Sequence, residues 1–273
     1  MKKCAYCDKT NNRITSEHVV NKAFLNKFYR SVIGYAKAYD KYTSNYLTSH
    51  DVCDVCNNGI LSTLDNYFLE FYSKNIPTIQ IVKDSSIKIE YDFDKLSKWL
   101  LKTLYNSERK HTYGNIPKKL HRFKQYILGA DKRTKLFKIY LELILDVPPL
   151  QIEKFVDEET RSQLPNKLSF LRIGTAVLSD QLRNGITEVV RYFTSSNFVF
   201  HVFVIDPGKH REKIFQQRLK EYVEISGVVL NYLDPQVGSI IAKASTRTIV
   251  DILENSIEGE DPYIISAMKN NLR

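Results

Sequence analysis

Apolar residues recur at helical spacing in two parts of the chain. Between residues 57 and 72 they fall three or four positions apart, on one face of a predicted helix: Leu61, Leu64, Phe68 and Phe71. A second helix is predicted from about residue 95, where one face carries Leu96, Trp99, Leu100, Thr103, Leu104 and Ser107. Basic residues fall on another face of that helix: Lys95, Lys98, Lys102 and Arg109. Each helix is therefore expected to bury one side.

Shorter apolar runs predict strands. A β-prone run that ends at Val19 and Val20 follows the turn at Asn11 and Asn12, and a second run covers residues 46–52. In the second half of the chain the pattern predicts strands at 168–178, 186–194, 198–205 and 225–233, and helices near 209–223 and 246–255. Strands and helices mixed in this way predict an α+β fold.

The composition is that of a globular protein. The chain has 273 residues and a mass of 31.8 kDa, with 43% apolar and 26% charged residues, so it can bury a core without disulfides. The sequence shows no secretion signal and no run of about 18 apolar residues. We therefore expect a cytoplasmic protein without a membrane partner.

Most of the positive charge lies in one block. Residues 95–140 contain 13 Lys and Arg against 2 Asp and Glu, in a chain whose formal net charge is +9. Such a block is typical of a protein that binds a polyanion, because Lys and Arg displace the counterions of phosphates. The expected phosphate contacts are Lys98, Lys102, Arg109, Lys110, Lys118, Lys119, Arg122 and Lys124. The alternative is a solvated surface on which charges cluster by chance.

The four cysteines form two C-x-x-C pairs, Cys4 with Cys7 and Cys53 with Cys56. Two such pairs can complete a closed four-thiolate Zn²⁺ site, which has a structural role because no position is open for chemistry. The 45 residues between the pairs exceed the spacing of a simple zinc ribbon and indicate an insertion. A redox dithiol and two disulfides are the alternatives.

The stretch "CAYC…SEHVV…DVCDVCNN" and the helix after it resemble the HNH endonuclease family, in its zinc-stapled ββα-metal form. The resemblance covers about residues 1–75. It implies that Glu17 and Asn57 bind one catalytic Mg²⁺ or Mn²⁺ ion and that His18 is the general base that deprotonates water. It also implies double-stranded DNA as the partner and, by analogy alone, bacterial antiviral defence or mobile-element biology as the setting.

These residue types suit phosphodiester hydrolysis. A neutral histidine can accept a proton from water near pH 7, and carboxylate and amide oxygens suit a hard cation. Adjacent residues of a strand point to opposite faces, so Glu17 and His18 can reach one phosphate only if the strand is bent or bulged. The family's base-orienting Asn on the second strand is missing. His50, Thr48 and the more distant Asn45 are the candidates in its place, and His50 is preferred. Asp65 is expected to be a solvated helix residue.

The sequence predicts three parts. Residues 1–75 form the zinc-stapled nuclease domain, 76–140 a basic and mainly helical segment, and 141–273 an α+β companion domain of unknown role. The predicted function is metal-dependent cleavage of DNA, and the alternative is a non-catalytic, zinc-stabilised nucleic-acid-binding protein. A protein-interaction domain with an acidic partner is the third hypothesis. A homo-oligomer, and a regulatory partner or ligand for residues 141–273, stay open.

Overall fold

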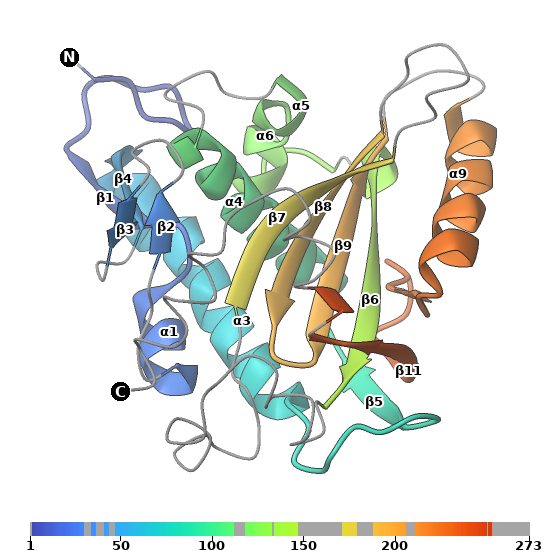
Figure 1. Ribbon diagram of the computed structural model, residues 1–273. Helices are drawn as coiled ribbons and strands as arrows, with labels where there is room; N and C mark the ends of the chain where they lie inside the picture. Colours follow the sequence, from blue (N-terminus) through green and yellow to red (C-terminus); the bar gives the residue numbers. More distant parts are fainter. Residues whose placement is uncertain are drawn as a thin grey trace.

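The computed structural model describes residues 2–29, 34–36, 41–43, 47–111, 118–132, 134–146, 171–178, 188–205, 211–249 and 251–252. Within these residues the fold is mixed α+β, as predicted (Figure 1). No helix in the described part of the chain is long and apolar enough to cross a membrane.

The N-terminal part contains two antiparallel strands followed by a long helix. Strand β1 (Ile14–His18) pairs with β4 (Thr48–Cys53), and the chain continues through the short helix α2 (Asp54–Cys56) and a π-helical turn, η2 (Asn57–Leu61), into α3 (Ser62–Asn75). Helix α1 (Lys22–Phe28) and the small hairpin of β2 (Gly34–Ala36) and β3 (Lys41–Thr43) lie between the two strands in the sequence. Both predicted strands are therefore present, but β1 ends at His18, before Val19 and Val20, and residue 46 lies outside the described residues. The helix that follows them is confirmed.

The apolar face predicted for the first helix is buried. Leu61 and Phe68 have no exposed surface, and Leu64 and Phe71 are at most 4% exposed. The Phe68 ring stacks on Trp99 of α4 (Phe93–His111), which in turn contacts the ring of Phe193 edge to face. Helices α3 and α4 consequently share one core with the sheet.

Seven strands of the described residues form one large sheet, in the order β5-β11-β6-β9-β8-β7, with β10 also paired to β6. Their bounds are β5 Ser86–Glu90, β6 Phe137–Leu145, β7 Leu171–Leu178, β8 Glu188–Ser195, β9 Phe198–Val204, β10 Asn231–Tyr232 and β11 Ser239–Thr248. Strands β11 and β6 are parallel, and the other neighbours are antiparallel. Strand β9 is buried along its whole length, because both faces of the sheet are covered there.

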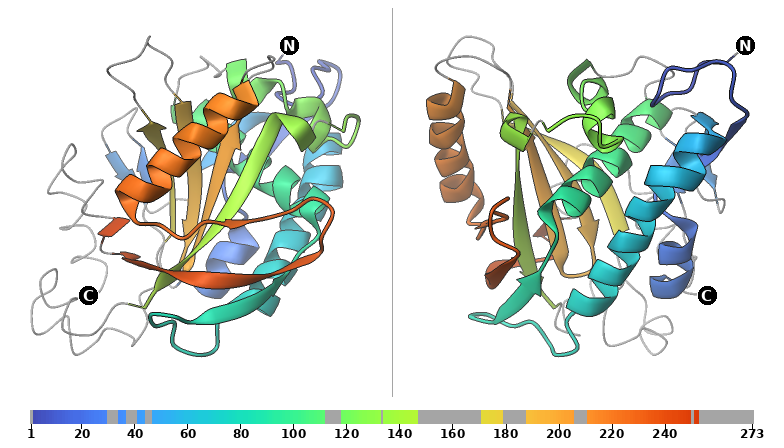
Figure 2. Two further views of the ribbon diagram at one scale, coloured as in Figure 1. Left: turned by 90° about the vertical axis from the view of Figure 1, so that its right-hand side faces the viewer. Right: turned by 180° about the vertical axis from the view of Figure 1, so that it is seen from behind.

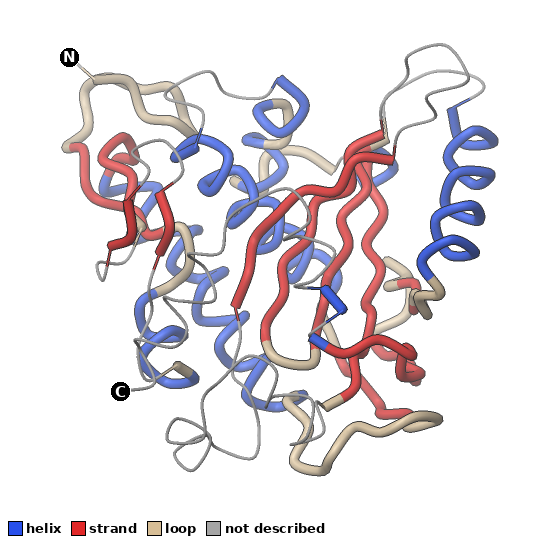
Figure 3. Tube along the Cα trace, viewed as in Figure 1, coloured by secondary structure: helices blue, strands red, loops and turns tan. Residues whose placement is uncertain are grey.

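Helices cover the large sheet on both faces (Figure 2). Helices α3 and α4 lie on one face, between the large sheet and the β1–β4 pair (Figure 3). Helix α9 (Arg211–Ser226) packs on the other face, where Phe215 contacts Phe203 of β9. The short helices α5 (Lys118–His121), α6 (Lys124–Ile127) and the 3₁₀ turn η3 (Thr134–Leu136) connect α4 to β6. Helix α4 therefore lies next to both the N-terminal strands and the large sheet.

The strand predictions were correct on the β9-β8-β7 side of the sheet and wrong on the side of β6, β10 and β11. Strands β7, β8 and β9 and helix α9 lie where the pattern placed them. The predicted strand 225–233 is wrong, because α9 continues to Ser226 and only Asn231–Tyr232 pairs with β6. The predicted helix 246–255 is wrong at its start, because β11 extends to Thr248. Strands β5, β6 and β11 were not predicted.

One hydrophobic cluster contains buried side chains from all three parts of the predicted division, from Cys4 to Ala242. Helices α4, α5 and α6 lie within residues 76–140, as expected for a mainly helical segment, together with β5 and the beginning of β6. The division at residues 75 and 140 stays a prediction.

Candidate functional site

The four cysteines converge, although 45 residues separate the two pairs. Their sulfur atoms all lie within 4.8 Å of one another, and the sulfurs of Cys7 and Cys53 are 3.7 Å apart. Tetrahedral coordination with Zn–S bonds of about 2.3 Å requires sulfur atoms about 3.8 Å apart. The cluster could therefore hold a metal ion.

Hydrogen bonds to sulfur favour a thiolate at Cys53. The Asn12 amide nitrogen lies 3.6 Å from the Cys53 sulfur, and the backbone N–H of Cys53 donates to the sulfur of Cys4 over 3.3 Å. Burial raises the pKa of Cys53, but hydrogen bonds from the Cys56 backbone and Asn12 outweigh it and lower the pKa to about 7. Burial and the neighbouring Cys53 thiol raise the pKa of Cys56. A metal ion would keep all four thiols deprotonated.

A bulge changes the register of the β1–β4 pair just before the predicted site residues. Thr15 is opposite Val52, whereas Glu17 is opposite Ser49 and His18 opposite Thr48, so β4 contains one extra residue at this point. A bulge of this kind bends a strand and redirects its side chains. The bent strand that a joint role for Glu17 and His18 requires is therefore present.

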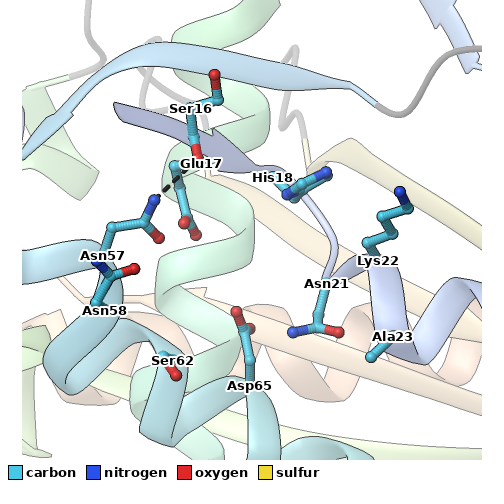
Figure 4. A pocket seen from close by; sticks show the side chains of 10 residues that line it. All are labelled: Ser16, Glu17, His18, Asn21, Lys22, Ala23, Asn57, Asn58, Ser62 and Asp65. Carbon is cyan, nitrogen blue, oxygen red and sulfur yellow. Dashed lines mark hydrogen bonds between the residues drawn. The ribbon is translucent and has the colours of Figure 1, made fainter. Parts of the chain in front are cut away.

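Glu17, His18 and Asn57 line one cavity of about 220 Å³. The strand β1, the beginning of α1, the turn η2 and the first turn of α3 form its wall: Ser16, Glu17, His18, Asn21, Lys22, Ala23, Asn57, Asn58, Ser62 and Asp65 (Figure 4). The structure thus brings together the three residues that the family resemblance singled out.

Asn57 is oriented by strand β1. Its side-chain N–H groups donate to Thr15 Oγ1 and to the Ser16 carbonyl oxygen, each over 2.9 Å. These bonds turn the side-chain oxygen of Asn57 toward the Glu17 carboxylate (Figure 4). The side-chain oxygen of Asn57 and the carboxylate of Glu17, which are both hydrogen-bond acceptors, therefore face each other at one end of the cavity.

A buried ionic cluster lies next to this point. The Lys102 ammonium is 2.7 Å from Oε1 of Glu17 and 2.6 Å from Oδ1 of Asp65, and it has no exposed surface. The Trp99 indole N–H also donates to Oδ1 of Asp65, over 3.0 Å. The expectation of a solvated Asp65 is wrong, because only 7% of this residue is exposed. Two carboxylates and one ammonium leave the cluster with one net negative charge.

Burial and charge set the protonation of this cluster. Burial raises the pKa of Glu17, and the Lys102 ammonium only partly offsets that effect. For Lys102, attraction by Asp65 and Glu17 outweighs burial and raises the pKa, so the ammonium stays charged. Burial, followed by the Lys102 charge, lowers the pKa of the half-buried His18. His18 is therefore neutral near pH 7, which is the form that accepts a proton.

His50 lies outside this arrangement. Its ring Nδ1 is 2.7 Å from Oγ of Ser16, at the exposed side of the strands, and His50 is not among the described residues that line the cavity. The predicted base-orienting role of His50 is not supported by these contacts. Asn106 of α4 contacts the site instead, since its side-chain nitrogen lies 3.3 Å from both Glu17 Oε1 and the His18 carbonyl oxygen.

Several residues of the predicted phosphate-binding surface are buried. Lys102 pairs with Glu17 and Asp65, Arg109 lies 2.5 Å from Asp51, and Lys124 lies 2.7 Å from Asp8. None of the three is more than 6% exposed. These placements contradict their assignment as phosphate contacts, because each of the three basic side chains is buried and paired with a carboxylate of the chain.

The other basic residues of that prediction have mixed placements. Lys98 is largely covered and bonds to Asp94 over 2.5 Å, and Arg122 donates to the carbonyl oxygen of Ile205. The side chains of Lys110, Lys118 and Lys119 lie outside the described part of the structure. For these residues phosphate binding stays a prediction.

No local pattern in the sequence indicates that Asp65, Lys102 and Asn106 belong to the site. Lys102 and Asn106 are one helical turn apart on α4, a spacing that places them on one face. Glu17 lies 89 positions before Asn106, and Asp65 lies 37 positions before Lys102. No local pattern therefore reveals these contacts.

Comparisons of the chain with models of known families, with curated proteins and with solved structures gave no match.

Proposed function

We propose that this protein is a metal-dependent endonuclease that hydrolyses phosphodiester bonds of DNA, with His18 as the general base. The observation that carries the proposal is the convergence of Glu17, His18 and Asn57 on one cavity, at the helix start that follows the four-cysteine cluster. These residues come from a bulged strand and from a turn 39 positions later, and nothing in a purely structural role requires them to share an opening.

The residues present fit a hard divalent cation. Glu17 and Asn57 would hold it, because their oxygens face each other and the neighbouring cluster has one net negative charge. Mg²⁺ or Mn²⁺ would supply electrostatic stabilisation of the negative charge that develops on phosphate oxygens. Asn57 is held in place for this role by Thr15 and Ser16.

His18 performs the proton transfer in this proposal. Its ring lines the cavity and is neutral near pH 7, so a ring nitrogen accepts the proton of the attacking water. The Lys102 ammonium contributes to that lowered pKa, and it holds the Glu17 carboxylate from behind. Base and cation ligand are thus adjacent in sequence but lie at different positions along the cavity wall (Figure 4).

The four cysteines would bind a structural Zn²⁺ ion. Cys56 directly precedes Asn57, so the metal would fix the position of the turn η2, which begins with Asn57. Zinc therefore acts on the site indirectly, by holding Asn57 next to β1.

The test is cleavage of supercoiled plasmid by the purified protein, with and without Mg²⁺ or Mn²⁺. Cleavage should require the cation and should fall by at least about 100-fold in His18→Ala, the scale expected on losing a general base. His121→Ala is the matched control, because His121 is exposed near Tyr105 and does not line the cavity. His50→Ala separates a role for that residue from a role for His18.

Uncut plasmid under every condition, or equal cleavage by His18→Ala, would refute the proposal. Retained DNA binding in an inactive protein would instead support the non-catalytic alternative. Single-stranded RNA and DNA of one sequence, tested in parallel, distinguish the two nucleic acids.

A further inference from the structure

Asn106 makes hydrogen bonds with both ends of its side-chain amide. The residue has no exposed surface. Its Nδ2 group lies 3.3 Å from Oε1 of Glu17 and 3.3 Å from the His18 carbonyl oxygen. Its Oδ1 atom accepts hydrogen bonds from the Tyr6 hydroxyl and the Arg109 guanidinium, both over 2.6 Å. One buried amide therefore contacts both of the neighbouring residues, Glu17 and His18, that line the cavity.

These partners permit one orientation of the amide. If it were turned by 180°, its NH₂ group would face Arg109, which can only donate. Its oxygen would then face the Glu17 carboxylate and the His18 carbonyl, which can only accept. A buried donor or acceptor without a partner costs about 1–3 kcal/mol, so the observed orientation is strongly preferred.

The acceptor side of Asn106 is anchored to two other elements. Arg109 also lies 2.5 Å from Asp51 of β4, and its guanidinium packs over the rings of Tyr6 and Tyr105. Tyr6 lies between Cys4 and Cys7 in the first cysteine pair. The amide is thus fixed by β4 and the cysteine cluster on one side, and it holds β1 on the other.

We propose that Asn106 is a positioning residue for the candidate site: it fixes the Glu17 carboxylate and the backbone at His18, so that the carboxylate and the imidazole keep their places in the cavity. The inference rests on the proposed endonuclease function. Asn106 acts through Glu17 and His18 and does not itself line the cavity.

The variant Asn106→Asp separates positioning from mere structural support. Aspartate keeps the oxygen that accepts from Tyr6 and Arg109, but it replaces the NH₂ donor with an oxygen that faces two acceptors. We expect kcat for plasmid cleavage at saturating Mg²⁺ to fall by about 10- to 100-fold, as for other residues that orient metal ligands, with a smaller change in KM.

Tyr6→Phe and Thr103→Val are the matched controls. Tyr6→Phe removes one hydrogen bond from the same amide, on the side that does not face the cavity. Thr103→Val changes another fully buried polar residue of α4, whose hydroxyl makes no hydrogen bond within the described residues. Both should keep kcat within about three-fold of the wild type, since they leave the donor side of Asn106 intact.

A folded Asn106→Asp protein with kcat within about two-fold of an active wild type would overturn the inference and leave the proposed function standing. An inactive wild type would overturn the proposed function itself. A second readout needs no variant: in ¹⁵N-labelled wild type, the Asn106 side-chain amide protons should exchange slowly and should shift on addition of Mg²⁺. Fast exchange, or signals unmoved by saturating Mg²⁺, would also refute the positioning role.

Discussion

The Lys102 ammonium lies 2.7 Å from Oε1 of Glu17, at a point where at most 4% of either side chain is exposed to solvent. It also bonds to both oxygens of Asp65, over 2.6 and 2.7 Å. A lysine from the middle of α4 is therefore the counterion of two carboxylates that come from β1 and α3. The charge of the candidate site therefore depends on Lys102, which lies outside the two elements that carry these carboxylates.

Replacing Lys102 should therefore destabilise the protein strongly. Lys102→Met would leave Glu17 and Asp65 buried without a counterion, and breaking such a pair costs about 3–5 kcal/mol. The free energy of unfolding in urea, at pH 7, measures the effect. Lys98→Met is the control on the same helix: Lys98 pairs with the exposed Asp94, and such pairs contribute about 0.5 kcal/mol or less. Equal stabilities of the two variants would contradict the structure.

Metal analysis tests the cysteine cluster. The purified protein should contain about one zinc ion per chain, and Cys56→Ser should lose the ion together with much of the stability of the N-terminal part. Val55→Ala, in the same C-x-x-C pair, should keep the metal, because the Val55 side chain is 67% exposed. Four thiols that react freely without metal release would show that the cluster holds no zinc.

A buried cluster on the other face of the large sheet predicts acid sensitivity. Glu142 of β6 is buried; its desolvation raises its pKa, but bonds from His201, over 2.9 Å, and Arg247, over 2.7 Å, outweigh that effect and lower the pKa to about 2. The unfolded chain takes up this proton near pH 4.5, whereas the folded protein does so only near pH 2. Stability from this carboxylate is therefore complete above pH 4.5 and is lost as the pH falls toward 2.

The shift corresponds to about 3 kcal/mol at neutral pH. Glu142→Gln should lose a comparable part of the unfolding free energy at pH 7, and its stability should approach that of the wild type near pH 2. Glu90→Gln is the control. Lys74 and Lys88 also lower the pKa of Glu90 to about 2, but these ion pairs are open to solvent. A pH-independent difference between Glu142→Gln and the wild type would refute the assignment.

The buried part of the basic block should not affect nucleic-acid affinity directly. Lys124→Gln breaks the contact with Asp8 and should cost about 1 kcal/mol of stability or more, but the salt dependence of DNA binding should stay unchanged. Lys22→Gln, at the cavity wall, should weaken binding and reduce that salt dependence. Fluorescence anisotropy of a labelled duplex at several salt concentrations measures both. A weaker salt dependence in Lys124→Gln would show that Lys124 does contact phosphates.

Local sequence patterns were sufficient to predict the buried face of the first helix and the convergence of the cysteines. The helix face of Leu61, Leu64, Phe68 and Phe71 is buried as predicted, because an amphipathic period determines which side packs. The two C-x-x-C pairs also predicted that the four cysteines converge, because four thiols with this spacing commonly surround one metal ion. The candidate cation ligands were found through the motif, not through periodicity.

Long-range pairing could not be predicted in this way. Counting charges within residues 95–140 showed an excess of Lys and Arg, but their carboxylate partners Asp8, Asp51 and Asp65 lie outside that window. Strand β6 has an almost continuous apolar run, which periodicity cannot distinguish from a buried helix. In β11, pairing of Thr248 with Leu145 of β6 continues the strand past the predicted helix start at Thr246.

Helix α4 has a consequence for any attempt to use the N-terminal part alone. Its Lys102 and Asn106 contact Glu17, while Trp99 contacts Phe193, and Glu108 bonds to Arg191, on the large sheet. A chain cut after residue 75 would keep the cysteines and every residue of the family motif, yet Glu17 and Asp65 would lose their shared counterion. The N-terminal part is thus not a portable module, and grafting it onto another protein would require α4 to be transferred with it.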